Sequence, residues 1–110
     1  MFEVSLKPLS VNEAWQGRRF KTRKYKQYQK DLTLLLPKSV IIPKGKLKIE
    51  FVFGTSSTLS DYDNFIKQTQ DIIAKKYKFD DKLIFEAHIK KQIVPKGKEF
   101  IHFNISSLKE

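Results

Sequence analysis

The chain has 110 residues and carries 22 Lys and Arg against 12 Asp and Glu, which gives a formal net charge of +10 at pH 7. This length suits one domain with a core of its own, and an apolar fraction of 40% is typical of a globular protein rather than a disordered one. The absence of cysteine excludes disulfides, thiolate metal sites and a cysteine nucleophile. The sequence shows neither a signal peptide nor an apolar run of about 20 residues, so we expect a soluble cytoplasmic protein.

The first thirty residues combine one expected strand with a strongly basic segment. Residues 2–6 alternate apolar and polar side chains and predict a strand, whereas residues 8–17 are rich in breakers and predict a loop. Trp15 in that loop is compatible with two roles, a core anchor or a surface on which a base stacks. The basic residues that follow, with no acid among them, are Arg18, Arg19, Lys21, Arg23, Lys24, Lys26 and Lys30. Such a run is either a solvated face or a contact for a polyanion, and the excess of positive charge favours nucleic acid.

The middle of the chain predicts a helix followed by a strand. Residues 18–21 form either a short strand or an ordered basic loop. Helical spacing begins near Arg23 and ends near Leu36, because the ring of Pro37 cannot continue the hydrogen-bond ladder. In residues 47–53 the apolar Leu47, Ile49, Phe51 and Phe53 share one face, with Lys48 and Glu50 on the other, which predicts a strand with one buried face.

The second half of the chain holds an amphipathic helical pattern between two pairs of acids. The helix is expected after Asp63, and Asp80 and Asp81 lie in the turn that follows it. Residues 83–93 and 100–105 then predict two strands, which we expect to pair as an antiparallel hairpin across the turn at residues 95–98. The resulting order of strands and helices predicts an α+β domain with a mixed sheet and two helices.

The paired acids have two interpretations. Carboxylate oxygens hold the divalent cations that assist phosphodiester cleavage. Asp61 and Asp63 stand two residues apart, so in an extended chain both would point toward one cation. Alternatively, they cap the following helix. Asp80 and Asp81 either cap a surface turn or join the first pair, which requires the next strand to fold back beside the strand that ends near Phe53.

Lys67 is the candidate electrostatic catalyst. It lies four residues after Asp63, where it forms either a surface ion pair or a contact that stabilises charge on a scissile phosphate. Carboxylates gathered within a basic chain indicate a metal-dependent nuclease. The alternative is a non-catalytic basic nucleic-acid-binding protein whose aspartates cap helices and turns.

These motifs together resemble the RusA family of Holliday junction resolvases over nearly the whole chain. The matching residues are Pro8 to Asn12 (PLSVN), the basic stretch and helix, Asp61-x-Asp63-Asn64-x-x-Lys67, Asp71 and the Asp80-Asp81 pair. The chain is one residue shorter than the family pattern between Asp71 and Asp80-Asp81, and we match Asp81 to the third metal-binding aspartate.

The resemblance implies a RusA-like endonuclease domain over residues 1–110. Members of the family are small, Mg²⁺-dependent homodimers, often encoded by phages or prophages, that resolve four-way DNA junctions in recombination and repair. The implied catalytic residues are Asp61, Asp63, Lys67 and Asp81. Of these, Asp61, Asp63 and Asp81 would bind the metal. The DNA-binding residues expected from the basic segment are Arg18, Arg19, Lys21, Arg23 and Lys24.

Overall fold

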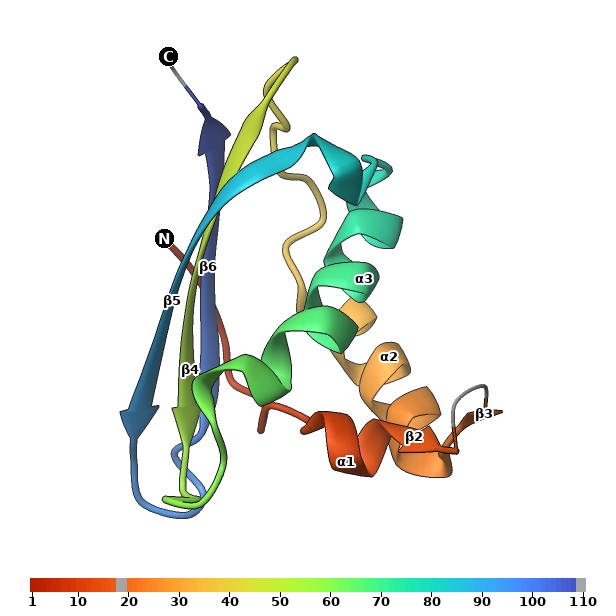
Figure 1. Ribbon diagram of the computed structural model, residues 1–110, viewed down its shortest axis with the longest axis vertical. Helices are drawn as coiled ribbons and strands as arrows, with labels where there is room; N and C mark the ends of the chain where they lie inside the picture. Colours follow the sequence, from red (N-terminus) through yellow and green to blue (C-terminus); the bar gives the residue numbers. More distant parts are fainter. Residues whose placement is uncertain (18–19, 109–110) are drawn as a thin grey trace.

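Helices cover one face of a four-stranded sheet in the computed structural model, which describes residues 1–17 and 20–108 (Figure 1). The elements are β1 (Phe2–Val4), α1 (Val11–Ala14), β2 (Trp15–Gln16), β3 (Phe20–Lys21), α2 (Arg23–Leu35), β4 (Leu47–Thr55), the 3₁₀ turn η1 (Tyr62–Phe65), α3 (Ile66–Tyr77), the 3₁₀ turn η2 (Asp81–Leu83), β5 (Ile84–Ile93) and β6 (Phe100–Ser107). This arrangement confirms the predicted α+β fold with a mixed sheet.

The core lies between the sheet and the helices. The strands run in the order β1-β6-β4-β5, and β4 pairs antiparallel with β6 and parallel with β5. Alternate residues of β4 from Leu47 to Phe53 are buried, as its sequence pattern predicts, and Ile101 and Phe103 of β6 extend the same layer. Both long helices, α2 and α3, pack on this apolar face of the sheet. The segment that follows β4 is thereby joined to the sheet through α3.

The predicted hairpin between β5 and β6 is wrong. The chain leaves β4, crosses over through α3 and returns as β5 parallel to β4, which is the usual outcome for a strand-helix-strand unit. β6 then pairs on the opposite side of β4, between β4 and β1. Burial explains why β6 and not β5 takes the central position, because inward residues of β6 such as Ile101 and Phe103 are fully buried while most of β5 is exposed.

The segment predicted as a loop at residues 8–17 contains the short helix α1. The side chain of Ser10 caps α1 by accepting from the backbone N–H of Glu13, and its hydroxyl donates to the Glu13 carboxylate at 3.1 Å. Serine followed three residues later by glutamate is the spacing of a capping box, and it is the signal that indicates this helix. Downstream, Phe20 and Lys21 form the short strand β3, whereas Arg18 and Arg19 lie outside the described residues.

Helix α2 begins at Arg23 and ends before Pro37, as predicted. The ring of Tyr25 in α2 meets the ring of Trp15 edge-on, with the ring centroids 5.2 Å apart. Trp15 packs against the core, which confirms its interpretation as a core anchor. The buried hydroxyl of Tyr28 bonds to Thr69 Oγ1 at 2.7 Å and joins α2 to α3. These contacts fix the basic helix α2 against the helix that carries Lys67.

Candidate active site

The fold brings the second acidic pair to the side of α3. The parallel return of β5 beside β4 places Asp81, just before β5, next to the helix. The ammonium of Lys67 lies between two carboxylates, 2.9 Å from Asp71 Oδ1 and 3.7 Å from Asp81 Oδ2. The strand pairing that the sequence alone left open therefore occurs. It brings Asp81 to Lys67, whereas Asp61 follows the opposite end of β4, because Ile84 pairs with Leu47 at the start of that strand.

Lys67 is held in its charged form by these neighbours. The hydrogen bond to Asp71 raises the pKa of Lys67 above its ordinary value, partial burial opposes this, and the negative charges of Asp71 and Asp81 raise the pKa further. The side chain is still 65% exposed, so an incoming anion can reach it. An ammonium of this kind can stabilise charge on a phosphate, but it has no free lone pair with which to act as a general base.

Asp61 and Asp63 lie in a different geometry from the one predicted. Asp61 has extended backbone angles, but the 3₁₀ turn η1 begins at Tyr62 and contains Asp63. The two side chains therefore do not share one side of an extended strand, and Asp63 precedes α3 instead of belonging to it. Within the described residues, Asp61 occupies the N-cap position of η1 without a side-chain capping bond, and both aspartates are exposed.

The structure separates the roles of Asp80 and Asp81. Asp80 caps the turn η2, because its Oδ1 accepts a hydrogen bond from the backbone N–H of Lys82 at 2.9 Å. The turn-capping interpretation is thus confirmed for Asp80. The carboxylate of Asp81 instead lies beside Lys67. Of the two, Asp81 is the one that contacts the candidate site.

A hydroxyl-rich loop connects β4 to Asp61. The backbone N–H of Ser57 donates to Thr55 Oγ1 at 3.2 Å, and the hydroxyl of Ser56 donates to Glu99 Oε2 at 3.0 Å. At the end of the loop, Lys91 Nζ from β5 donates to the backbone carbonyl of Ser60 at 2.5 Å. Lys91 lies outside the acidic and basic motifs of the sequence.

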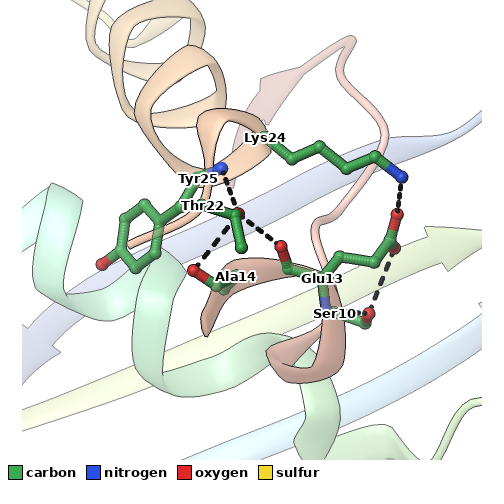
Figure 2. Close-up of polar contacts among 6 residues, drawn as sticks. All are labelled: Ser10, Glu13, Ala14, Thr22, Lys24 and Tyr25. Carbon is green, nitrogen blue, oxygen red and sulfur yellow. Dashed lines mark hydrogen bonds and ion pairs between the residues drawn. The ribbon is translucent and has the colours of Figure 1, made fainter. Parts of the chain in front are cut away.

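The basic segment is anchored through Thr22 and Glu13 (Figure 2). Thr22 Oγ1 caps α2 by accepting from the backbone N–H of Tyr25, and its hydroxyl donates to the carbonyl of Glu13 at 2.5 Å. Lys24 Nζ pairs with the Glu13 carboxylate at 3.2 Å. Burial alone would raise the pKa of Glu13, but the bonds from Lys24 and Ser10 outweigh it and the pKa lies below its usual value. The charge of Lys24 is therefore partly neutralised, while Arg23 is exposed at the start of α2.

The substitution Thr22→Val should lower the free energy of unfolding by about 1–2 kcal/mol, since it removes the cap of α2 and the bond to α1. Urea denaturation measures this loss. Thr33→Val is the matched control, because Thr33 is exposed on the same helix and donates only to the carbonyl of Gln29. Equal stability of the two variants would show that Thr22 does not anchor the basic segment.

Tyr25 connects the basic segment to the acidic cluster. The ammonium of Lys21 lies 5.0 Å above the ring of Tyr25. Burial raises the pKa of Tyr25, the charge of Asp71 raises it further, and the charge of Lys67 opposes the shift. The phenol is therefore close enough to sense both charges of α3. Of the expected DNA-binding residues, Lys21 therefore contacts the tyrosine whose pKa the charges of Asp71 and Lys67 influence.

The donors fit Mg²⁺ in chemical type but are not gathered into a complete ligand set. In the part of the chain that the structure describes, no group of three or more His, Asp or Glu side chains is placed to hold a metal ion. Mg²⁺ commonly takes only one or two carboxylates and completes its shell with water and substrate phosphate. Asp61 and Asp63 are exposed, as that mode of binding requires, and Asp81 lies 3.7 Å from Lys67.

Comparison with known proteins gives no family assignment. No family model matches the chain, and no curated protein matches it. The resemblance to RusA resolvases therefore rests on the residue pattern alone. No helix among residues 1–17 and 20–108 is both long enough and apolar enough to cross a membrane.

Proposed function

We propose that this protein is a metal-dependent, structure-selective DNA endonuclease that resolves four-way Holliday junctions by paired nicks in recombination and repair. The observation that carries the proposal is the position of Lys67, whose ammonium lies between Asp71 and Asp81 in the first turn of α3, directly after the turn η1 that contains Asp63. The cluster joins two separate elements, since Lys67 and Asp71 belong to α3 and Asp81 belongs to η2. A cation-assisted reaction on a phosphodiester needs such carboxylates, together with a fixed positive charge.

Each side chain has a distinct proposed role. Asp61, Asp63 and Asp81 would hold Mg²⁺, which supplies charge neutralisation and an activated water when it is bound. Lys67 stabilises the negative charge that develops on the scissile phosphate, because it stays protonated at neutral pH. Asp71 orients Lys67 through their 2.9 Å hydrogen bond.

The partner is branched DNA, and the active form is a homodimer. A four-way junction presents two symmetry-related strands for cleavage, so two copies of one site can nick both. The basic segment would hold the arms by their phosphates, a mode that depends on salt but not on sequence. Two observations support this division of roles: Lys21 and Arg23 are exposed, and Lys21 lies over the ring of Tyr25.

Replacing Arg18, Arg19 and Lys21 together by Ala should weaken junction binding and flatten its dependence on salt. Each lost phosphate contact lowers the slope of log K against log salt by about 0.9, so three contacts lower it by about 2.7. Fluorescence anisotropy with a labelled junction at several salt concentrations measures the slope. Cleavage should recover at saturating protein, since these residues lie outside the proposed metal site.

The control for that variant removes the same charge elsewhere, through alanine at Lys38, Lys44 and Lys48. These residues lie in the connection before β4 and on β4 itself. The control should retain most of the salt slope. An unchanged slope in the Arg18, Arg19 and Lys21 variant would show that DNA is held by another surface.

The second candidate function is a nucleic-acid-binding protein without catalysis. The capping bond from Lys82 to Asp80 favours it, because it assigns one aspartate a purely structural role. The same role does not account for Asp81, whose carboxylate faces Lys67. Incubation with a synthetic four-way junction, with and without Mg²⁺, separates the two candidates, since only the endonuclease produces nicked product.

A further inference from the structure

Lys91 occupies a position in β5 where the strand pattern calls for an apolar residue. In the parallel register with β4, Ile89 lies opposite Phe51, Lys91 opposite Phe53 and Ile93 opposite Thr55. Phe51, Phe53 and Thr55 are all buried on the helix-covered side of the sheet, so Lys91 belongs to the inward row of β5. Lys91 is half-buried in this row, and the next residue of the row, Ile93, is 50% exposed, so a polar partner on the protein side favours a lysine here.

The partner of Lys91 is the backbone immediately before Asp61. Its ammonium donates to the carbonyl oxygen of Ser60 at 2.5 Å, and a charge-assisted bond of this type is stronger than one between neutral groups. The other bonds at the end of the loop stay within it, because the Ser60 hydroxyl and the Leu59 N–H both donate to Ser57 Oγ, at 3.4 and 3.3 Å. Lys91 thus ties the end of the loop to the sheet at the residue that precedes the first candidate metal ligand.

Asp61 depends on its backbone for its orientation. Its side chain makes no capping bond within the described residues, whereas its carbonyl accepts from the backbone N–H of Asn64 at 3.1 Å. Where the chain is held on either side of Asp61 therefore sets the position of its Cα–Cβ bond, from which the carboxylate would reach a cation. Active-site groups must be held to within about 0.5 Å to work, so the tie at Ser60 matters for the proposed chemistry.

We propose that Lys91 is a positioning residue of this site, which fixes Ser60 and thereby the carboxylate of Asp61 for cation binding. This inference rests on the proposed endonuclease function. Lys91 does not contact the reacting atoms in this role. It acts through the backbone, so its removal should weaken the response to Mg²⁺ more than it weakens DNA binding.

The variant Lys91→Met keeps the length of the side chain and removes the charge. We expect the Mg²⁺ concentration for half-maximal junction cleavage to rise about 10-fold or more, the scale of losing a group that orients a metal ligand. We also expect faster amide hydrogen exchange over residues 57–62. Lys91→Arg should restore both properties, because its guanidinium can donate to the same carbonyl.

Lys90→Met is the matched control, since Lys90 is the next residue of β5 and lies opposite Val52 in the outward row. It should leave the Mg²⁺ response and the exchange unchanged. An unaltered Mg²⁺ response in Lys91→Met, or exchange equal to that of Lys90→Met, would overturn the positioning role. If the wild-type protein cleaves no junction, the proposed function fails, and hydrogen exchange alone then decides whether Lys91 holds the loop.

Discussion

Asp63→Asn is expected to abolish junction cleavage while leaving junction binding unchanged or tighter. The substitution removes a carboxylate that the cation needs, and it also removes a negative charge that repels DNA phosphates. Because Asp63 is exposed in η1, the fold should tolerate asparagine there. We expect the rate of single-turnover cleavage in Mg²⁺ to fall by more than about 10³-fold. This is at least as large as the effect of removing one group that stabilises the transition state. Fluorescence anisotropy without a divalent cation measures the binding.

Asp80→Asn is the matched control for this prediction. Asparagine can accept the hydrogen bond from Lys82 and keep the cap of η2, so this variant should cleave near the wild-type rate. Asp81→Asn should behave like Asp63→Asn. A cleaving Asp63→Asn variant would refute the assignment of the metal site. If Asp80→Asn were inactive and Asp81→Asn active, Asp80 would be the third metal-binding aspartate instead of Asp81.

Lys67→Ala should reduce cleavage by about 10²-fold or more, which is the scale of losing one preorganised electrostatic contact. The loss should be similar from pH 6 to pH 9. Asp71 and Asp81 raise the pKa of Lys67 above its ordinary 10.5, so its charge disappears only as the pH rises beyond that value. Thermal stability should change little, since exposed ion pairs contribute little to folding. Cleavage rates and thermal unfolding curves measure the two effects.

Lys75→Ala serves as the control for Lys67→Ala, because Lys75 is exposed on the same helix two turns further along. It should cleave normally. If Lys67→Ala lost much stability yet kept full activity per folded molecule, Lys67 would be a structural residue that holds η2 against α3.

The long helices and strands could be predicted from local pattern, but the pairing of the strands could not. Alternation in β4 and the position of Pro37 after α2 are local signals, and both elements formed where expected. The sequences of β5 and β6 each indicate a strand, and a short turn between them favours a hairpin. The positions of β5 and β6 on the two sides of β4 depend instead on the burial of Ile101 and Phe103. That competition involves the whole sheet, so it is not visible in the sequence of either strand.

The candidate site was predictable in its residue types and less so in its geometry. A 3₁₀ turn of four residues has no apolar period, which is why Asp63 was expected in extended chain. The contact between Lys67 and Asp81 depends on the parallel register of β5. The role of Lys91 also depends on this register, because only its pairing with Phe53 shows that this lysine belongs to the inward row of β5.

The most direct test of the account is cleavage of an end-labelled synthetic four-way junction by the wild-type protein, in Mg²⁺ and in EDTA. The account predicts symmetrically placed nicks in two opposite strands in Mg²⁺, no nicks in EDTA, and no cleavage of a linear duplex of the same sequence. Tight binding of the junction with no cleavage at any Mg²⁺ concentration would contradict it.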